Sequence, residues 1–447
     1  MPLTALEIYK YLPKTNCKEC KFPTCLAFAM ALAQKKASLS DCPHVSEDAK
    51  AALEGASAPP IRLVSIGTGE RKAEIGGETV LFRHELTFFH PTALAVEVSD
   101  SLDEAALARA GEEIHGLSFE RVGMTIGVNL VAVRGESGSP ARFAAAVAAL
   151  KKAAGLPFVL MSRKPDELEP ALKLLKGERP LIFAAGKDTL AAMAALAKAH
   201  GAPLALTADT LDELAELTPK AVAAGVTDLV LGFEGRSLGR NLQDLTTCRR
   251  AALKKAFRAL GYPLAVVASH PDPFAEAAAA ATYVAKYGGI VVVRGRSPAE
   301  ILSILTVRQN IFTDPQKPIQ VKPGVYSIGE ANEKSPVLVT TNFSLTYYNV
   351  AGDVEASRVP SWILVVDTEG TSVLTAFASD KLNADKVTAM LKDGAGIGSK
   401  VTHHKVVIPG LVAAMSAKLK DASGWEVLVG PRESSGIPKF LKSISVS

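Results

Sequence analysis

Residues 158–200 read FVLMSRKPDELEPALKLLKGERPLIFAAGKDTLAAMAALAKAH and contain the repeating unit that decides the fold. This stretch begins with the apolar run Phe158–Met161, continues to a second run at Leu181–Ala184, and ends in the alanine-rich helical stretch Thr189–His200. Short apolar runs separated by helical patterns are typical of parallel strands joined by crossover helices. We therefore expect an α/β architecture around this stretch.

The same alternation extends over residues 61–310. Eight apolar runs mark candidate strands: Ala93–Val98, Val122–Val133, Phe158–Met161, Leu181–Ala184, Leu204–Thr207, Leu229–Leu231, Leu264–Ala268 and Ile290–Val293. Amphipathic stretches such as Pro140–Ala154 and Leu245–Leu260 separate them. An open doubly wound sheet would give a similar local pattern, but eight β–α units favour a closed (β/α)₈ TIM barrel. Ile61–Glu85, with Gly76-Gly77 between two apolar runs, predicts a hairpin that caps the bottom of the barrel.

Two segments divide the chain into three predicted domains. Glu54–Pro60 (EGASAPP) and the proline- and glycine-containing residues 311–335 have the composition of linkers. We expect a small helical domain at residues 1–57, the barrel at 58–312 and a further α/β domain at 313–447. In that last domain, helical patterns separate four short apolar runs, which predicts a doubly wound, Rossmann-like sheet. The runs are Val337–Thr341, Trp362–Asp367, Val406–Ile408 and Val427–Val429.

Composition limits the classes of function. The 447 residues include 50 basic and 46 acidic side chains, and the net charge is +4. The basic residues form no long block, so we expect no nucleic-acid partner. No run reaches the ~18 uncharged apolar residues of a membrane span, and the N-terminus lacks the pattern of a signal peptide. These features predict a cytoplasmic protein without a membrane segment.

Four of the five cysteines lie close together near the N-terminus, at Cys17, Cys20, Cys25 and Cys42. In a large cytosolic chain, such crowding favours metal or redox chemistry over disulfides. The spacing Cys-x₂-Cys-x₄-Cys-x₁₆-Cys suits a [4Fe–4S] cubane, because four thiolates bind four separate irons. A zinc site that uses Cys₄, or three cysteines with His44, is the main alternative. We assign no role to the isolated Cys248, which is typical of a small buried side chain.

Glycine and hydroxyl residues follow the predicted strands of the last domain. In an open α/β sheet, ligands bind at the carboxyl ends of the strands, and glycine lets the backbone approach them closely. Each loop alone would be an ordinary turn, but together they indicate a large polar ligand. The loops begin at Asn342, Thr368, Gly394, Pro409 and Gly430.

Several familiar motifs are absent from the sequence. Gly394–Gly398 (GAGIG) follows a helix and not the first strand, so it is not a dinucleotide-binding fingerprint. The sequence contains no P-loop, no serine-nucleophile elbow and no HExxH motif. It also contains no D-x-H-x-x-G run, which supplies the lower cobalt ligand in many cobalamin-binding domains. Gly232, Gly235 and Gly239 could line a ligand site at the mouth of the barrel, although an ordinary glycine-rich loop is the simpler interpretation.

The whole chain resembles the large (gamma) subunits of the corrinoid iron–sulfur proteins of the anaerobic acetyl-CoA (Wood–Ljungdahl) pathway. The residues that carry this resemblance are Thr15–Cys20 (TNCKEC), Pro23–Cys25 and Cys42-Pro43, together with residues 337–355 and 365–376. The resemblance implies a corrinoid-dependent methyl carrier. A cobamide accepts a methyl group from methyltetrahydrofolate through a separate methyltransferase and passes it to acetyl-CoA synthase. The [4Fe–4S] cluster supplies an electron that returns Co(II) to Co(I).

The resemblance also implies partners and a cofactor site. The partners are a small barrel subunit that forms a heterodimer with this chain, the methyltransferase, acetyl-CoA synthase and a reductive activator. We place the cobamide at the carboxyl edge of the last sheet, base-off and without a histidine ligand, and name no catalytic amino acid. The expected cofactor-binding residues are Thr340, Thr346, Gly370, Thr371, Ser372, Val373, Gly396, Gly398, Gly410, Gly430, Ser434, Ser435, Gly436 and Ile437. An iron–sulfur electron-transfer subunit, a pterin-binding barrel methyltransferase and a non-enzymatic scaffold are the alternatives.

Overall fold

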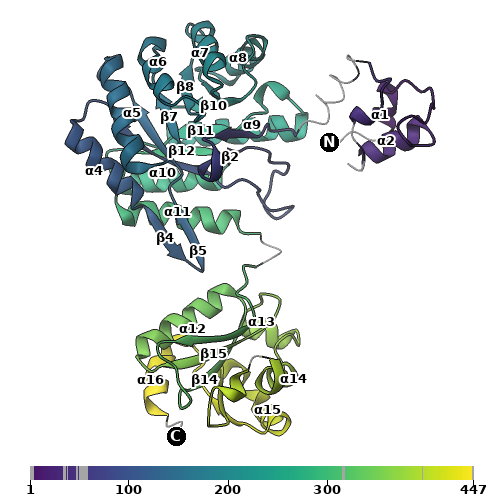
Figure 1. Cartoon of the computed structure of the whole chain (residues 1–447), viewed down its shortest axis with the longest axis vertical. Helices are drawn as coiled ribbons and strands as arrows, with labels where there is room; N and C mark the ends of the chain where they lie inside the picture. The colour runs from purple at the N-terminus through teal and green to yellow at the C-terminus, as the bar shows by residue number, and fades with distance from the viewer. Residues whose placement is uncertain are drawn as a thin grey trace. The chain divides into compact units, whose positions relative to one another are not determined.

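A computed structural model describes residues 5–33, 37, 39–46, 49, 59–314, 318–394 and 396–444 (Figure 1). The chain divides into two compact units, one of residues 1–118 and 127–312 and the other of residues 119–126 and 313–447. Much of the predicted linker Glu54–Pro60 lies outside the described residues.

The first unit contains a closed barrel of eight parallel strands, with each strand followed by a helix (Figure 1). The strands are β3 (Ala93–Ser99), β6 (Leu130–Arg134), β7 (Phe158–Met161), β8 (Leu181–Ala185), β9 (Leu204–Leu206), β10 (Leu229–Phe233), β11 (Leu264–Val267) and β12 (Ile290–Val293). The helices are α4 (Glu104–His115), α5 (Pro140–Ala154), α6 (Pro165–Leu174), α7 (Leu190–His200), α8 (Leu211–Ala223), α9 (Leu238–Lys255), α10 (Pro273–Ala285) and α11 (Pro298–Phe312). The TIM barrel predicted from the alternating pattern is therefore confirmed.

Side-chain caps explain where several of these helices begin. Asp103, Ser139, Thr210 and Ser237 each precede a helix, and each side chain accepts a hydrogen bond from a backbone N–H in the first turn. Such caps satisfy donors that have no partner inside the helix and stabilise its start by about 1 kcal/mol each.

A hairpin closes the bottom of the barrel. Strands β1 (Val64–Ile66) and β2 (Ala73–Ile75) pair antiparallel, and their apolar side chains join the core inside the barrel. The predicted hairpin is confirmed, but the turn was misplaced. The chain reverses between Ile66 and Ala73, and Gly76-Gly77 follow the second strand.

The prediction of a single strand at Val122–Val133 was wrong. The segment contributes to two different sheets, because β4 (Ser118–Arg121) pairs with β5 (Met124–Gly127) and only β6 joins the barrel. The tip of the β4–β5 hairpin, Val122-Gly123, has positive φ at both residues, which matches the twist of a tight hairpin turn.

The second unit contains a five-stranded sheet of order β13-β15-β14-β16-β17. Strands β14 (Val337–Thr341), β15 (Ser361–Val366), β16 (Lys405–Ile408) and β17 (Glu426–Val429) are parallel, and β13 (Gly324–Ile328) pairs antiparallel with β15. Strand β13 lies in residues 311–335, where we expected only a linker, so that interpretation was wrong. The chain moves to one side of β14 for β15 and to the other side for β16, so the strand order reverses at β14.

Helices cover both faces of this sheet (Figure 1). Helices α12 (Ser344–Ser357) and α16 (Ile437–Ser443) pack on one face around Leu338 and Val365. Helices α13 (Val373–Ala378), α14 (Ala384–Ala389) and α15 (Ser416–Ser423) pack on the other around Val339 and Leu364. This confirms the doubly wound, Rossmann-like fold.

The N-terminal segment is helical, as predicted. It contains α1 (Ala5–Tyr11), α2 (Cys25–Ala33) and the 3₁₀ turn η1 (Leu39–Asp41). Within the ranges that the structure describes, no helix combines the length and the apolar character needed to cross a membrane.

Candidate functional site

Three of the four N-terminal cysteines lie in one small apolar cluster. Cys20, Cys25 and Cys42 are buried among side chains that include Phe28, while Cys17 is exposed. Cys25 is the first residue of α2, and Cys42 follows η1 directly. Sequence positions as far apart as Cys20 and Cys42 therefore meet in one place, as a shared metal centre requires.

Asn16 fastens the first cysteine loop to the start of α2. Its side-chain Oδ1 accepts a hydrogen bond from the backbone N of Cys25 at 2.8 Å, and its own backbone N donates to Cys25 Sγ at 3.4 Å. Asn16 has φ +50°, a left-handed conformation that asparagine tolerates better than most residues. The sequence pattern included Asn16 but gave it no role.

Cys17 lies beside two other possible ligands. The Cys17 Sγ atom, a Glu19 carboxylate oxygen and a His44 ring nitrogen all lie within 4.8 Å of one another. His44 Nε2 is 3.0 Å from Glu19 Oε2, so the imidazole already has a carboxylate partner. A zinc site that includes His44 remains an alternative donor set to a cluster bound by the four thiolates.

A cavity of about 220 Å³ opens at the carboxyl ends of β14 and β16. It lies where the strand order reverses, which is the usual place for a ligand in an open α/β sheet. The residues of the predicted site that line it are Thr340, Thr346, Ser372, Val373, Gly430, Ser434 and Ile437.

Most of the cavity wall is apolar, which sequence reasoning missed. The wall includes Val350 of α12, Leu374 of α13 and Leu411 of η6 (Gly410–Met415). Arg432 is a charged lining residue that we did not predict. Apolar residues at strand ends look like ordinary core residues in a sequence, so their pattern alone could not assign them to a ligand site.

Thr340 lines this cavity and carries a polar group without a partner. The side chain is fully buried, and within the described chain its Oγ1 atom has no hydrogen-bond partner. A buried polar group without a partner costs about 1–3 kcal/mol. A ligand toward which this hydroxyl turned would remove that cost by bonding to it.

Asn342 organises the loop that follows β15. Its Oδ1 atom accepts hydrogen bonds from Thr368 N, Thr368 Oγ1 and Gly370 N at 3.0, 2.9 and 3.0 Å. Its Nδ2 atom donates to Gln320 and Asp367, both at 3.1 Å. Asn342 thereby fixes the path of the chain toward Ser372 and Val373.

Gly370 and Thr371 belong to this loop but do not line the cavity. Gly370 has φ +72°, and a Cβ atom there would lie 2.7 Å from Gln320 Cγ. The positive φ and the nearness of Gln320 therefore explain why residue 370 is a glycine. Thr371 Oγ1 donates to Thr368 O at 2.7 Å within the same turn.

The remaining predicted residues divide into two groups. Gly410, Ser435 and Gly436 adjoin the cavity; a Cβ atom on Gly410 would lie 2.6 Å from Gly430 O, so only glycine fits. Gly396 and Gly398 lie on the segment that leads into the start of β16. On that segment Lys400 Nζ lies 5.0 Å from the ring centre of Trp362, near the start of β15. The structure therefore brings these two glycines to the amino edge of the sheet and not to the cavity.

Both histidines of residues 313–447 lie at this amino edge. His403 Nε2 is 2.9 Å from Ser335 O, and His404 packs edge-on against Trp425. They precede β16, whereas the cavity is at the opposite ends of the strands. Neither is in a position to bind a metal in the cavity.

A second, larger cavity of about 670 Å³ occupies the mouth of the barrel. Gly235 lines it, whereas Gly232 packs against Phe183 and Thr207. Arg134 forms ion pairs with Glu97 at 2.7 Å and Glu234 at 2.6 Å. Although burial opposes it, these two carboxylates raise the pKa of Arg134. The positive charge of Arg134 in the mouth of the barrel is therefore balanced by the carboxylates of Glu97 and Glu234.

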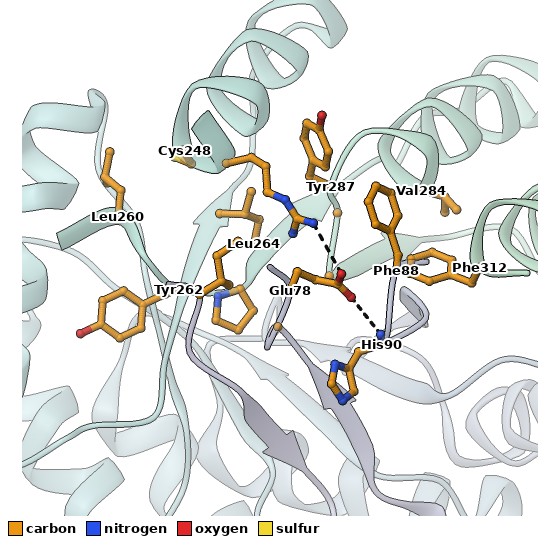
Figure 2. A pocket seen from close by; sticks show the side chains of 16 residues that line it. Glu78, Phe88, His90, Cys248, Leu260, Tyr262, Leu264, Val284, Tyr287 and Phe312 are labelled. Atoms are coloured by element: carbon orange, nitrogen blue, oxygen red, sulfur yellow. Dashed lines mark hydrogen bonds and ion pairs between the residues drawn. The ribbon is translucent and has the colours of Figure 1, made fainter. Parts of the chain in front are cut away.

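A third pocket, at the bottom of the barrel, is small and structural (Figure 2). Buried Arg249 donates to Val80 O at 2.7 Å, lies 3.5 Å from Glu78 and stacks on Phe88 and Tyr287. These contacts hold the segment after β2 against the barrel. Cys248 lies beside them, and burial raises the pKa of its thiol to about 12, which makes it unreactive.

Comparison with known proteins separates the cysteine segment from the rest of the chain. A family model described as "CO dehydrogenase/acetyl-CoA synthase delta subunit" matches residues 63–441. A second, described as "Putative Fe-S cluster", matches residues 12–44, which include all four clustered cysteines.

Several relatives cover essentially the whole chain. The corrinoid/iron-sulfur protein large subunit of Moorella thermoacetica is 48% identical over 99% of this chain and 99% of its own length. The acetyl-CoA decarbonylase/synthase complex subunit gamma of Methanothermobacter thermautotrophicus is 39% identical over 100% of both chains. Among solved structures, dihydropteroate synthase from Thermus thermophilus is 20% identical, covers 56% of this chain and 100% of its own, and has a TM-score of 0.38. That score is too low to support an argument. The full-length matches show that the chain belongs to the family of corrinoid/iron–sulfur protein large subunits and acetyl-CoA decarbonylase/synthase gamma subunits.

Proposed function

We propose that the chain is a corrinoid-dependent methyl carrier, with a cobamide at the cavity of the second unit and a [4Fe–4S] cluster on Cys17, Cys20, Cys25 and Cys42. When bound, the cobamide would supply a nucleophilic cobalt that takes a methyl group from methyltetrahydrofolate, through a separate methyltransferase, and gives it to acetyl-CoA synthase. The cluster would supply one electron for reductive reactivation of that cobalt. The observation that carries the proposal is the cavity at the strand reversal, which Thr340 lines with a hydroxyl that has no partner among the described residues.

The residues around the cavity suit a corrinoid. Thr340, Thr346, Ser372 and Ser434 offer neutral hydroxyls, which match the neutral amides around a corrin ring. At about 220 Å³, the cavity has room for one part of such a cofactor.

The arrangement of histidines supports base-off binding without a protein ligand. His403 and His404 are the only histidines after residue 313, and both have contacts at the amino edge. An axial base donates electrons to cobalt and makes its reduction harder. A cavity without histidine therefore suits a carrier that must be kept reduced.

The N-terminal cysteines suit a low-potential cluster. Hydrogen bonds to the sulfurs, burial and net charge set the potential of such clusters. Here three sulfurs are buried among apolar groups, which disfavours the more negatively charged reduced cluster and so lowers its potential. The backbone hydrogen bond to Cys25 Sγ acts in the opposite direction. A cytoplasmic location is part of the proposal, because free thiolates persist in reducing compartments.

The chain would act as one component of a multi-protein system. The name of the Moorella relative, a large subunit, supports a heterodimer with a small barrel subunit. The further partners would be the methyltransferase, acetyl-CoA synthase and a reductive activator. In this proposal the amino acids bind and orient the cofactors, and none acts as an acid, base or nucleophile.

Extraction of the bound cofactor, followed by mass spectrometry, tests the proposal. One corrinoid per chain, with iron and acid-labile sulfide, is the expected result. Folate without corrinoid would instead support a pterin methyltransferase that uses the barrel mouth. A cluster without corrinoid would indicate a pure electron-transfer subunit, and stoichiometric zinc without sulfide would refute the cluster.

A further inference from the structure

One charged side chain lines the cavity at the carboxyl edge of the second unit. Among the described residues around this cavity, Arg432 carries the only charge, and the others are apolar or neutral, such as Leu411 and Thr340. Arg432 lies in the loop that follows β17 and leads to α16. A single positive charge in an otherwise neutral wall favours a ligand that carries one anionic group.

Backbone contacts hold the Arg432 loop against the end of β16. Gly430 N donates to Ile408 O at 2.9 Å, and Gly410 N donates to Pro431 O at 3.0 Å. A Cβ atom on Gly410 would lie 2.9 Å from Arg432 N, so the two loops approach as closely as glycine allows. The backbone that carries Arg432 is therefore fixed beside the cavity.

The charge of Arg432 has no acidic partner within the described chain. Its side chain is exposed, and it forms no ion pair, hydrogen bond or ring contact with another described residue. The adjacent acid, Glu433, is also exposed, but it does not line the cavity. The guanidinium donors of Arg432 are therefore available to a ligand in the cavity.

A cobamide carries an anionic group of the kind that Arg432 can bind. The side chains of its corrin ring end in neutral amides, whereas its nucleotide loop contains one phosphodiester, which is negative at neutral pH. A guanidinium group binds phosphate oxygens through two parallel N–H···O bonds. The hydroxyls of the wall suit the amides, and Arg432 suits the phosphodiester.

We propose that Arg432 binds the phosphodiester of the nucleotide loop, so that the cavity selects corrinoids that carry a phosphate over those that lack one. The inference rests on the proposed function, because it requires a corrinoid at this cavity. The interaction is noncovalent, and Arg432 takes no part in the transfer of the methyl group.

The test measures the binding of three Co(II) corrinoids to the full-length, cluster-loaded protein prepared without a corrinoid. Cobalamin contains the complete nucleotide loop, cobinamide phosphate ends at the phosphate, and cobinamide lacks the phosphate. Equilibrium dialysis with absorbance detection gives the affinity for each. For R432Q, we expect the affinities for cobalamin and cobinamide phosphate to fall by about ten-fold and the affinity for cobinamide to stay unchanged.

Two further measurements follow the charge itself. R432K keeps the positive charge but loses the planar pair of donors, so we expect an affinity for cobinamide phosphate between those of the wild type and R432Q. Dissolved salt screens the attraction between the arginine and the phosphate. The difference between the wild type and R432Q should therefore shrink as sodium chloride is increased.

K439Q is the matched control. It removes one exposed positive charge from α16, and Lys439 does not line the cavity. We expect K439Q to bind all three corrinoids as the wild type does. Since Arg432 is exposed and makes no polar contact within the described chain, R432Q should unfold at the wild-type temperature, which separates lost recognition from lost structure.

Equal affinities of the wild type and R432Q for cobinamide phosphate would overturn the proposal. A loss that is as large for cobinamide would show that Arg432 does not recognise the phosphate, and an equal loss in K439Q would assign the effect to net charge; either result also overturns it. Failure of the wild type to bind any of the three corrinoids would instead refute the proposed function. That outcome is seen before any variant is compared.

Discussion

Thr340 and Thr341 are neighbours at the end of β14 with similar burial but different surroundings. Both side chains are fully buried, and neither hydroxyl has a hydrogen-bond partner among the described residues. Only Thr340 lines the cavity. The two positions therefore form a matched pair for a test of the cofactor site.

Replacing either threonine with valine removes an unpaired buried hydroxyl, so we expect unchanged or increased stability of the cofactor-free protein. T340V should weaken cobamide binding by about 1 kcal/mol, or roughly five-fold, because a hydrogen bond is lost. T341V should bind as the wild type does. Thermal unfolding and equilibrium binding check these outcomes, and equal effects on binding would contradict the placement of the cofactor.

Asn16 tests the cysteine site. N16G keeps a residue that accepts positive φ but loses the acceptor for Cys25 N. Since this hydrogen bond contributes about 1 kcal/mol, we expect a chelator to remove iron from N16G roughly five-fold faster. Cobamide binding should not change. Iron loss at the wild-type rate would show that the hydrogen bond from Cys25 N to Asn16 does not stabilise the cluster.

Asn342 links two elements and acts as a positioning residue. N342A would leave three donors of the loop after β15 without their shared acceptor, and we expect unfolding to become easier by about 2 kcal/mol. Cobamide loading should fall, while the cluster stays intact.

Asn383 offers a control for Asn342, because its side chain caps α14 by accepting a hydrogen bond from Lys386 N at 2.9 Å. N383A should cost about 1 kcal/mol of stability without an effect on loading. If N342A also binds cobamide normally, the loop does not position the cofactor.

Helices α10 and α11 carry a pair of buried acids. Burial and the neighbouring Glu276 raise the pKa of Glu300 to about 7, against 4.5 for an unperturbed glutamate. The protonated form is thus favoured in the folded state. The free energy of unfolding is therefore unaffected by this group below pH 4.5. It falls as the pH rises toward 7, because the unfolded state then releases a proton that the folded state retains. E300Q should remove this dependence and stabilise the protein at pH 7, relative to the wild type, by on the order of 2 kcal/mol. An equal difference in unfolding free energy between the wild type and E300Q at pH 5 and at pH 7 would contradict the raised pKa of Glu300.

The strands show what the sequence could predict. The eight barrel strands follow from apolar runs between helical patterns, because a strand buried on both faces is continuously apolar. Val122–Val133 was misassigned since two adjacent apolar runs, one in a hairpin and one in the barrel, have the same composition. Strand β13 was missed because its residues GVYSI lie among prolines and glycines that are typical of a linker.

At the scale of the whole molecule, the cysteine segment could be recognised from the sequence and the cavity only in part. Cysteine spacing is local in sequence, so Cys17, Cys20 and Cys25 mark a candidate site without reference to the fold. Gly396 and Gly398 could not be placed, because a glycine loop does not reveal at which edge of a sheet it lies. The apolar wall of the cavity was hidden for a different reason: a sequence does not distinguish residues that face a ligand from residues that face the core.

The electron paramagnetic resonance spectrum of Co(II) in the full-length, corrinoid-loaded protein tests the central claim most directly. The two histidines of the last domain lie at the amino edge of the sheet, so neither of their imidazoles reaches a cofactor at the carboxyl edge. We therefore predict cobalt hyperfine lines without further splitting by a nitrogen nucleus. Nitrogen splitting, from a histidine or from the base of the cofactor, would contradict base-off binding at this cavity.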